Sequence, residues 1–384
     1  MAADKDIQIS VVIPCFNEEE TVGETIAKAK IGLSKFSLGS EIIIVNNGST
    51  DNSAKIAVSS GARVISESEK GYGYALIRGF DEAKGKYIVM GDADNTYDLS
   101  ELDKFIRPLM DGHDLVMGSR LKGNIMPGAM KWLHRYIGNP LLSFSMNLLF
   151  GTDISDSQCG MRAFTKEAYR QMRLQTGGME LASEMVVNAA KARLKITEVP
   201  INYYPRKGKS KLRSFSDGWR HIRFMLLYSP TYLFLLPGEI IFSLGFILML
   251  ALLPGPLLIG GHGYDVHVMV LASTLAILGY QIIFLGLYAK IYSLAEGFEE
   301  EDKAINLITK YFTLEKGLYA GMALFLAGFG INLYILLKWI AGGFGQLAEV
   351  RAALVALTLI VIGIQTIFSS FFISILLIRK AKRK

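Results

Sequence analysis

Two aspartates separated by one residue, Asp92 and Asp94, are the first candidates for chemistry. They follow the apolar run Tyr87–Met90 and a single glycine. Two carboxylates in an extended turn can both reach one hard divalent cation, and that cation can bridge the phosphates of a nucleotide. We therefore expect a divalent metal site at Asp92 and Asp94, although a solvated loop with the same spacing is the alternative.

Polar side chains also follow two earlier apolar runs. The run Ile7–Ile13 leads into Pro14–Glu18, and the run Glu41–Val45 leads into Asn46 and Asn47. The turn after the first run contains no glycine, whereas a dinucleotide-binding turn needs small residues there, which argues against an NAD-dependent enzyme. The histidines show no HExxH or paired spacing, so we expect no zinc site.

Short β-branched runs alternate with amphipathic stretches from Ile7 to Ile201, which predicts a Rossmann-like, mainly parallel α/β sheet with helices on both faces. Ligands of such sheets bind at the carboxyl ends of the strands, where the polar residues above lie. The predicted strands are Ile7–Ile13, Glu41–Val45, Arg63–Ile65, Tyr87–Met90, Leu115–Met117 and Ile196–Val199. The predicted helices are Glu19–Leu33, Ser53–Ser60, Tyr74–Lys84, Ser100–Met110 and Glu180–Ala192.

The composition indicates a second, apolar environment, because 51% of the 384 residues are hydrophobic, only 20% are charged and the mean hydropathy is +0.32. Long charge-free runs in the C-terminal part reach the roughly 20 apolar residues that cross a bilayer. We predict a membrane domain over residues 230–384, with four transmembrane helices at about 231–253, 267–290, 317–338 and 352–378. The two cysteines cannot form a disulfide framework, which favours a reducing compartment.

The Lys and Arg residues in the short loops predict the orientation of these helices. The loop Gly255–Asp265 contains neither residue, whereas the segment from Lys290 to Lys316 and the C-terminal tail are both rich in them. Both basic segments, both termini and the whole N-terminal domain are therefore expected in the cytoplasm. The polar start, Met1–Ser10, lacks the apolar run that is typical of a cleaved signal peptide.

The segment before the first span combines basic residues with an apolar stripe. Phe215, Trp219 and Ile222 recur at helical spacing beside several Lys and Arg residues. This pattern is typical of a helix that lies in the lipid headgroup layer, and a basic cluster that only sets topology is the alternative. We therefore expect a domain over residues 1–212 and an interfacial amphipathic helix over residues 213–229, followed by the membrane domain.

Further motifs stand in a fixed order along the N-terminal part of the chain. They are Val11–Glu19, Asn46–Asp51, Gly91–Asp94, Gly118–Arg120, Asp156–Phe164, and Glu198–Ile201 followed by Arg206 and Ser210–Leu212. Their order and spacing resemble family 2 glycosyltransferases of the GT-A fold. The later motifs resemble the branch that contains dolichol-phosphate mannose synthases and polyprenyl-phosphate hexose synthases.

The resemblance implies a nucleotide-sugar site with a metal ion. Asp92, Asp94 and Thr96 would hold Mg²⁺ or Mn²⁺ on the diphosphate. The commonest family pattern has Asp-Asp-Gly-Ser where Asn46–Ser49 stands here, and so the base of the nucleotide, guanine or uracil, stays open. The residues implied to bind the nucleotide sugar are Pro14, Phe16, Asn17, Glu18, Asn46, Asn47, Lys70, Gly71, Asp92, Ala93 and Asp94.

The resemblance also implies a polyprenyl or dolichyl phosphate as the acceptor. Its phosphate is ionised near neutral pH, so no strong general base is required, but basic side chains must bring two anionic groups together. Glu184 is expected either to orient an acceptor-binding arginine or to contact sugar hydroxyls, and a helix-face carboxylate paired with a lysine is the alternative. The residues implied to bind the acceptor phosphate are Arg120, Arg135, Arg206, Ser210 and Lys211, and those implied to be catalytic are Asp94, Arg120, Arg135 and Glu184.

Together these features predict a membrane-bound, inverting enzyme that transfers mannose or glucose from GDP-mannose or UDP-glucose to the lipid phosphate. A processive polysaccharide synthase is one alternative, but its Gln-x-x-Arg-Trp motif is missing, and Trp219-Arg220 has the opposite order. A transporter or flippase is another, but only small polar residues lie at mid-membrane depth and the spans show no clear repeat. We expect no nucleic-acid partner and leave a homo-oligomer open.

Overall fold

The computed structural model describes residues 6–207, 214–295 and 313–381. It divides into two compact units, Met1–Tyr228 and Ser229–Lys384. Ser210 and Lys211, both predicted to bind the acceptor phosphate, lie outside the described residues.

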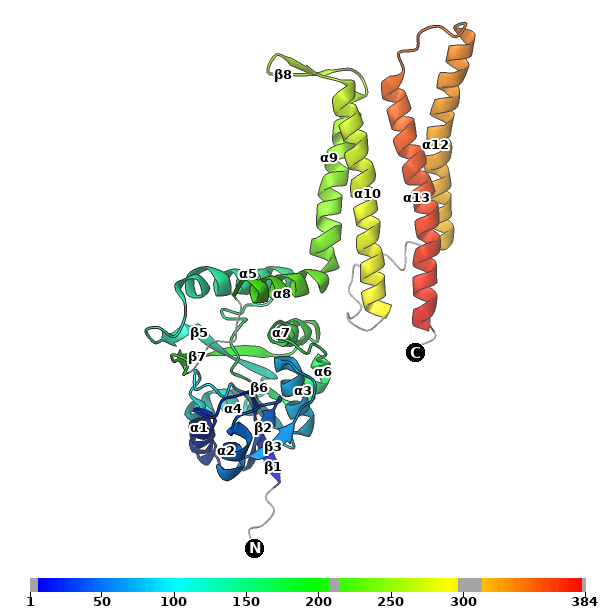
Figure 1. Ribbon diagram of the computed structural model, residues 1–384. Helices are drawn as coiled ribbons and strands as arrows, with labels where there is room; N and C mark the ends of the chain where they lie inside the picture. Colours follow the sequence, from blue (N-terminus) through cyan, green and yellow to red (C-terminus); the bar gives the residue numbers. More distant parts are fainter. Residues whose placement is uncertain (1–5, 208–213, 296–312, 382–384) are drawn as a thin grey trace. The chain divides into compact units, whose positions relative to one another are not determined.

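The first unit is built on a seven-stranded, mainly parallel sheet (Figure 1). Its strands are β1 (Ile7–Cys15), β2 (Gly39–Asn46), β3 (Arg63–Ser66), β4 (Tyr87–Met90), β5 (Leu115–Ile125), β6 (Arg162–Thr165) and β7 (Ile196–Tyr203). They lie in the order β3-β2-β1-β4-β6-β5-β7, and only β6 runs antiparallel to its neighbours. The α/β sheet predicted from the sequence is confirmed, and β6 is an additional strand that the alternation did not predict.

Helices cover both faces of this sheet (Figure 1). Successive residues of a strand point to opposite faces, so Val11 and Ile13 lie in one core and Val12 lies in the other. The helices of the first face are α1 (Val22–Ser34), α2 (Ser53–Ser59) and α4 (Asp103–Met110). Those of the second face are α3 (Tyr72–Glu82), α5 (Asn139–Phe150), α6 (Lys166–Met172), α7 (Leu181–Lys191) and α8 (Ser214–Leu227).

Three details of the first unit differ from the sequence-based prediction. The helix expected from Glu19 begins at Val22, because a turn precedes it in which the N–H groups of Thr21 and Val22 bond to Glu18 O. Helix α5 was not predicted, since most of its residues are apolar and its polar residues at helical spacing, Asn139, Ser143 and Asn147, are buried or half-buried rather than on an exposed face. Helix α6 was not predicted either, because its two turns are too short for a clear period.

Within its described residues, the second unit contains four helices that are long and apolar enough to cross a membrane, which confirms the four predicted spans. Their bounds are Thr231–Leu252, Val266–Leu294, Leu314–Ala341 and Val350–Leu377. They belong to the π-helical turn η3 (Thr231–Leu235) with α9 (Leu236–Leu252), and to α10 (Val266–Ala295), α12 (Leu314–Ala341) and α13 (Val350–Ala381). A short hairpin of β8 (Leu257–Ile259) and β9 (His262–Tyr264) connects α9 to α10.

The four spans form two helical hairpins of the same design, α9–α10 and α12–α13 (Figure 1). A Cβ atom on Gly279 would lie 2.2 Å from Phe242 N, and one on Gly363 would lie 2.6 Å from Phe325 N. Each hairpin therefore brings a glycine of its second helix against the backbone of its first helix. The expectation that the spans hold no clear repeat is corrected, because helix packing identifies equivalent positions that apolar composition conceals.

Candidate active site

The turn after β4 brings the three predicted metal-binding residues together. Asp94 is 7% exposed, and its Oδ1 accepts hydrogen bonds from Thr96 N at 3.1 Å and from Thr96 Oγ1 at 2.6 Å. Asp92 Oδ1 accepts a hydrogen bond from the Tyr72 hydroxyl at 2.9 Å. The first turn of α3 and the loop itself therefore hold both carboxylates at the carboxyl end of the sheet.

Asp92 is the most perturbed carboxyl group of this turn. Burial and, next, the negative charge of Asp94 raise the pKa of Asp92 to about 7, while the hydrogen bond from Tyr72 opposes the shift. Two carboxylates that share a partly enclosed site repel one another, so one of them holds its proton more tightly than usual. A divalent cation between them would remove this repulsion.

The donor set fits a magnesium or manganese ion that is completed by phosphate oxygens. Such ions are often bound through one or two protein carboxylates, and the remaining ligands come from water and substrate phosphates. Among the described residues, no group of three or more His, Cys, Asp or Glu side chains is placed to hold a metal alone. Gly160 adjoins the turn, and a Cβ atom there would lie 2.9 Å from Asp92 Oδ2. The absence of a side chain at Gly160 thus leaves room beside Asp92.

Arg206, just after β7, joins the turn after β1 to the carboxylate turn. Its Nη2 lies 2.7 Å from Glu18 Oε1, and its Nη1 lies 3.4 Å from Asp94 Oδ2. Its Nε is buried and has no hydrogen-bond partner within the described part of the chain. The structure therefore brings together three residues that were predicted from separate motifs. A guanidinium in this position suits phosphate oxygens as well as carboxylates.

Arg120, on β5, is held by a buried carboxylate. Its Nε lies 2.6 Å from Asp156 Oδ2 and its Nη2 lies 2.8 Å from Asp156 Oδ1, while the guanidinium carbon lies 5.1 Å from the centre of the Tyr203 ring. Burial favours the neutral form, but the charge and hydrogen bonds of Asp156 outweigh it and raise the pKa of Arg120. An incoming phosphate would therefore meet an arginine that already uses two of its N–H groups.

Glu184, on α7, is 1% exposed and binds backbone rather than basic side chains. Its oxygens accept hydrogen bonds from Gln175 N and Thr176 N, both at 2.9 Å, and from Thr176 Oγ1 at 2.6 Å. In the same loop, Gly177 O accepts the first N–H groups of α3. These contacts assign Glu184 to the loop that packs on the start of α3, and they include neither the arginine nor the lysine that the sequence suggested.

Two predicted basic residues are more accessible. Arg135 lies half-buried in the π-helical turn η2 (His134–Gly138), with its guanidinium carbon 5.3 Å from the centre of the Tyr136 ring. Lys70 is exposed and precedes Gly71, whose N–H donates to Asn47 Oδ1 at 2.9 Å. Neither forms an ion pair with any residue that the structure describes, so both are free to meet an anionic ligand.

Amide and hydroxyl side chains tie together the loops after β1 and β2. Asn17, with a φ of 53°, accepts a hydrogen bond from Thr50 N at 2.8 Å, and its own N–H donates to Ser49 Oγ at 3.0 Å. Asn46 Oδ1 accepts a hydrogen bond from Ser49 N at 3.0 Å. The predicted residues Asn17 and Asn46 therefore fix the shape of the two loops at this edge of the sheet.

Asn47 extends this network to the loop after β3. Its Nδ2 donates to Glu67 O at 3.1 Å and to Glu69 O at 2.7 Å. A carboxylate is acceptor-only when ionised, so an aspartate at this position could not donate these two hydrogen bonds. The asparagine that departs from the common family pattern thus has a structural role in holding the adjacent loop.

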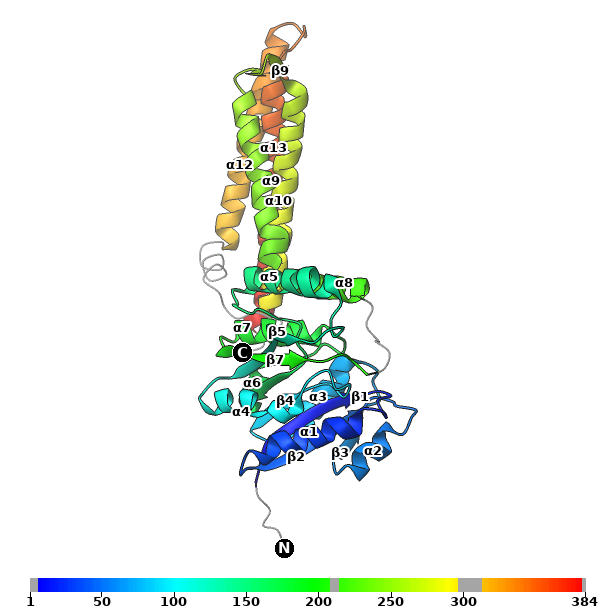
Figure 2. The same cartoon turned by 90° about the vertical axis from the view of Figure 1, so that its left-hand side faces the viewer.

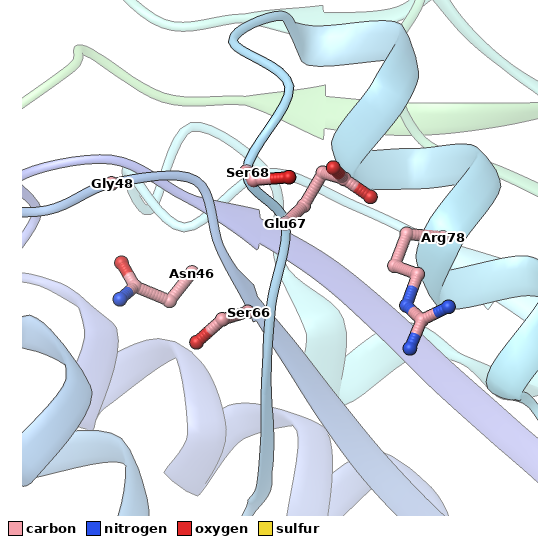
Figure 3. A pocket seen from close by; sticks show the side chains of 6 residues that line it. All are labelled: Asn46, Gly48, Ser66, Glu67, Ser68 and Arg78. Atoms are coloured by element: carbon pink, nitrogen blue, oxygen red, sulfur yellow. The ribbon is translucent and has the colours of Figure 1, made fainter.

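A pocket of about 430 Å³ opens at the ends of β2 and β3 (Figure 3). Its lining offers amide, hydroxyl, carboxylate and guanidinium groups, which suit the polar edge of a nucleotide base. The residues that line it are Asn46, Gly48, Ser66, Glu67, Ser68 and Arg78. Only Asn46 among them was predicted to bind the nucleotide. Ser66, Glu67, Ser68 and Arg78 belong to no motif, and the parallel pairing of β2 with β3 places Ser66 beside Asn46.

The remaining predicted nucleotide-binding residues border the same strand ends. Pro14 is half-buried, and Phe16 is 44% exposed, so an aromatic face is open to a ligand there. Ala93 is 3% exposed, and its carbonyl accepts a hydrogen bond from Thr25 Oγ1. Ala93 therefore influences the site through the position of its backbone, because its side chain is not accessible to a ligand.

An apolar surface runs along α5, the turn before it and α8, and these two helices lie side by side (Figures 1 and 2). On the side of α5, Trp132 is 66% exposed and Phe144 is 62% exposed; on α8, Trp219 is 58% exposed and Leu227 is 63% exposed. Large exposed aromatic and aliphatic side chains in one patch mark a surface that contacts a membrane or another protein. The predicted interfacial segment thus has a second apolar helix beside it.

Comparison with known proteins identifies both units. Residues 10–173 match the family model for glycosyl transferase family 2, and residues 287–377 match the model for the glycosyltransferase family 2 C-terminal transmembrane region. Among solved structures, the glucosyl-3-phosphoglycerate synthase of Mycobacterium tuberculosis superposes with a TM-score of 0.45 at 23% identity, over 59% of this chain and 78% of that one. At that TM-score the superposition adds no weight to the assignment.

Two relatives from Haloferax volcanii extend the similarity. The low-salt glycan biosynthesis hexosyltransferase Agl6 is 38% identical over 97% of this chain and 90% of its own length. A dolichyl-phosphate hexose transferase is 32% identical over 55% of this chain and 89% of its own length. With a relative of this identity matched along nearly its whole length, the chain belongs to glycosyltransferase family 2 and is an integral membrane glycosyltransferase.

Proposed function

We propose that the enzyme transfers a hexose from a nucleoside diphosphate sugar to a polyprenyl or dolichyl phosphate, with inversion at the anomeric carbon. The observation that carries the proposal is the meeting of Asp94 with Arg206 and Glu18 at one edge of a family 2 domain that is joined to four membrane spans. Carboxylates and a guanidinium in contact suit a site in which a metal-bound diphosphate and a second phosphate lie close together. The similarity to a dolichyl-phosphate hexose transferase supports the acceptor.

The donor would occupy the strand ends from β3 to β4. Its base would lie in the pocket at Asn46 and Ser66, and its diphosphate would lie at Asp92 and Asp94. A divalent cation on these carboxylates would supply positive charge to the departing nucleoside diphosphate. The uncharged Asn46 and Asn47 leave both GDP-mannose and UDP-glucose as donors to be tested, since an amide can donate and accept hydrogen bonds.

The acceptor would approach through basic side chains. Its ionised phosphate oxygen forms the new bond to the anomeric carbon, while the bond from that carbon to the donor phosphate breaks and its electron pair leaves with the nucleoside diphosphate. No proton need be removed from the acceptor, because a phosphate monoester is largely ionised at neutral pH. Arg206, Arg120 and Arg135 would offset the repulsion between the two phosphates, and Ser210 and Lys211 would act in the segment that follows.

The catalytic unit would face the cytoplasm and rest on the membrane through the patch on α5 and α8. Exposed Trp132 and Trp219 support this contact, because tryptophan favours the headgroup layer. The basic segments after the second and fourth spans support a cytoplasmic side for both termini. A lipid acceptor would then reach the arginines without leaving the bilayer.

The test is a transfer assay with detergent-purified enzyme, Mn²⁺, a short polyprenyl phosphate and a panel of radiolabelled GDP- and UDP-hexoses. Label from one donor should move into the organic phase, and the Asp94→Asn variant should lose this transfer. Asp111→Asn is the matched control, since Asp111 is an exposed acid at the end of α4. If the label appears in water-soluble polymer instead, the enzyme is a processive synthase. If the nucleotide is released without lipid labelling, the proposed acceptor is wrong.

A further inference from the structure

Two sequence motifs recur in the membrane unit. The motif Gly-x-x-x-Phe-x-x-Gly-Phe occurs in α9 at Gly238–Phe246 and in α12 at Gly321–Phe329. The motif Thr-Leu-x-x-x-Gly-x-Gln-x-Ile-Phe occurs in α10 at Thr274–Phe284 and in α13 at Thr358–Phe368. The second hairpin therefore repeats the first, helix for helix and in the same order.

The repeated glycines make the same contacts in both hairpins. A Cβ atom on Gly238 would lie 2.9 Å from Ile283 N and 3.1 Å from Gly279 O. In the second hairpin, a Cβ atom on Gly321 would lie 3.0 Å from the N atom of Ile367 and 2.7 Å from Gly363 O. Each pair occupies equivalent positions of the motifs, so the repeat is one of packing as well as of sequence. Small residues of this kind let membrane helices approach closely.

The two hairpins pack on each other through α10 and α13. A row of hydroxyl contacts connects these helices: Ser273 with Thr358 at 2.7 Å, Tyr280 with Thr366 at 2.5 Å, and Tyr288 with Ser369 at 2.6 Å. The residues that meet do not occupy equivalent positions of the repeat, because Thr358 matches Thr274 rather than Ser273. The hairpins thus join head to tail, through different faces of equivalent helices.

The face of α13 that packs against α10 has an exposed counterpart at the equivalent positions of α10. On α13 it is covered, with Thr358 1%, Ile362 6% and Ser369 4% exposed. The equivalent residues of α10 lie open, with Leu278 46% and Leu285 53% exposed. We call this face the α10 outer strip; it consists of Leu271, Thr274, Leu278, Gln281 and Leu285.

The face of α10 that packs against α13 likewise has an exposed counterpart at the equivalent positions of α13. On α10 it is covered by α13, with Ser273 3% and Phe284 5% exposed. The equivalent residues of α13 lie open, with Leu357 49% and Phe368 70% exposed. We call this face the α13 outer strip; it consists of Leu357, Ile364, Phe368, Phe371 and Ile375.

A polar side chain marks the α10 outer strip as more than a lipid-facing surface. Gln281 lies near the middle of the span Val266–Leu294, is exposed, and forms no hydrogen bond with any residue that the structure describes. An amide that faces hydrocarbon without a partner is costly, so Gln281 is more favourably placed against protein than against lipid. The equivalent Gln365 lies on the face of α13 that packs against α10, although its Oε1 also lacks a partner among the described residues.

We propose that a second copy of this chain docks head to tail, with the α13 outer strip of one copy on the α10 outer strip of the next. The contact repeats the one that already joins the two hairpins within each chain, and each copy offers both halves of it. Such a heterologous contact closes into a ring or continues as an array, and it does not form a two-fold dimer.

The contacts within one chain predict the contacts between copies. Ser273 with Thr358 becomes Leu357 of one copy with Thr274 of the next. We would co-express two differently tagged chains, one with Leu357→Cys and one with Thr274→Cys, and oxidise them in native membranes. A cross-linked product that carries both tags is expected. The native Cys15 and Cys159 are buried in the first unit and serve as the background control.

Three outcomes decide the proposal. Formation of the mixed product, and its loss when Thr274→Cys is the only variant present, supports it. Cross-linking of Thr274→Cys with itself in preference to Leu357→Cys indicates a two-fold contact and overturns it. No product from either pair, while Ser273→Cys with Thr358→Cys cross-links inside one chain, shows that both strips face lipid and also overturns it.

A second measurement does not depend on cysteine geometry. Gln281→Trp should weaken self-association in detergent by about tenfold, because the larger ring cannot fit between the two strips. Asn332→Trp is the matched control, since Asn332 is an exposed amide in a span, on α12 and outside both strips. An equal effect of the two substitutions, or none for Gln281→Trp, would show that the α10 outer strip takes no part in the contact.

Discussion

The catalytic unit and the membrane unit are specified by opposite means. At the strand ends of the first unit, positions are fixed by polar atoms: Asn47 donates to two carbonyls and Glu184 accepts from two backbone N–H groups. In the second unit the closest approaches occur at glycines such as Gly245 and Gly279, where no side chain separates the helices. The structure of the first unit therefore depends on the identity of individual polar side chains. The packing of the second unit depends on the absence of side chains where its helices meet.

This difference predicts that conservative substitutions will separate chemistry from assembly. A change of charge at constant volume at the proposed metal-binding carboxylate Asp94 should stop the catalytic unit from working while it stays folded. A change of volume at constant polarity should loosen the membrane unit while the chemistry of each folded molecule persists.

The largest effect is expected for Asp94→Asn. The amide keeps the volume of the carboxylate but removes the charge that would hold the metal and face Arg206. Loss of one preorganised electrostatic group at a leaving group lowers turnover on the order of 10³-fold. Initial rates of label transfer at saturating donor measure this loss. An unchanged unfolding temperature together with the lost turnover would support the comparison, whereas a comparable drop for Asp111→Asn would contradict it.

The next largest effect concerns the stability of the catalytic unit, at Asp156→Asn. The side chain of Asp156 is 0% exposed and pairs with Arg120, whose side chain is 9% exposed. Removing one partner leaves a buried charge without compensation, which lowers the free energy of unfolding by about 3 kcal/mol. Thermal unfolding followed by circular dichroism measures the loss. The double variant Asp156→Asn with Arg120→Met should recover part of it, and failure to recover any would mean that Asp156 acts on the fold independently of Arg120.

A smaller loss of stability is expected for Gly279→Ala in the membrane unit. The added Cβ atom would lie 2.2 Å from Phe242 N, so the two helices must separate, which costs about 2 kcal/mol. Gly330→Ala is the matched control, because nothing lies within 4 Å of a Cβ atom there. Unfolding in mixed micelles of increasing SDS content measures both. Equal losses for the two variants would show that helix propensity, and not packing between helices, sets the stability.

The sequence predicted the fold and the motifs of the catalytic unit better than it predicted the contacts of individual side chains. The motifs at Asp92–Asp94 and Asn46–Asn47 are polar residues at strand ends, and parallel strands necessarily bring such ends together, as the contact of Arg206 with Asp94 and Glu18 illustrates. The role of Glu184 was less accessible, because a buried carboxylate that binds backbone has no partner visible in the sequence. Ser66 and Arg78 line the pocket without belonging to any motif.

The spans were predicted by hydropathy, but their arrangement was not. Apolar helices share so much composition that a repeat among them is easily overlooked in the sequence, and the backbone contacts of Gly279 and Gly363 show which positions are equivalent. The repeat removes one argument against a transporter. The other argument stands, because the hydroxyls of Ser273 and Thr358, which lie between the hairpins, bond to each other and not to a polar cavity.

The smallest effect tests whether the chemistry depends on the protonation of one carboxyl group. The pKa of Asp92 is raised to about 7, whereas an aspartate in an unfolded chain titrates near 4. Between these values the folded protein holds a proton that the unfolded chain has released, so the free energy of unfolding without metal falls as pH rises from about 4 to about 7. Because a metal must displace this proton, the affinity for Mn²⁺ should rise about tenfold per pH unit below pH 7 and level off above it.

Titration calorimetry with Mn²⁺ from pH 5.5 to 8.5 measures this dependence, and Tyr72→Phe sharpens it. The Tyr72 hydroxyl donates to Asp92 and lowers its pKa, so the variant should level off at a higher pH than the parent enzyme. Gly279→Ala should leave the whole curve unchanged, since it alters helix spacing and no charge. A shifted pH dependence of Mn²⁺ affinity in Gly279→Ala would mean that helix packing in the membrane unit affects protonation in the catalytic unit. The two units would then not be independent.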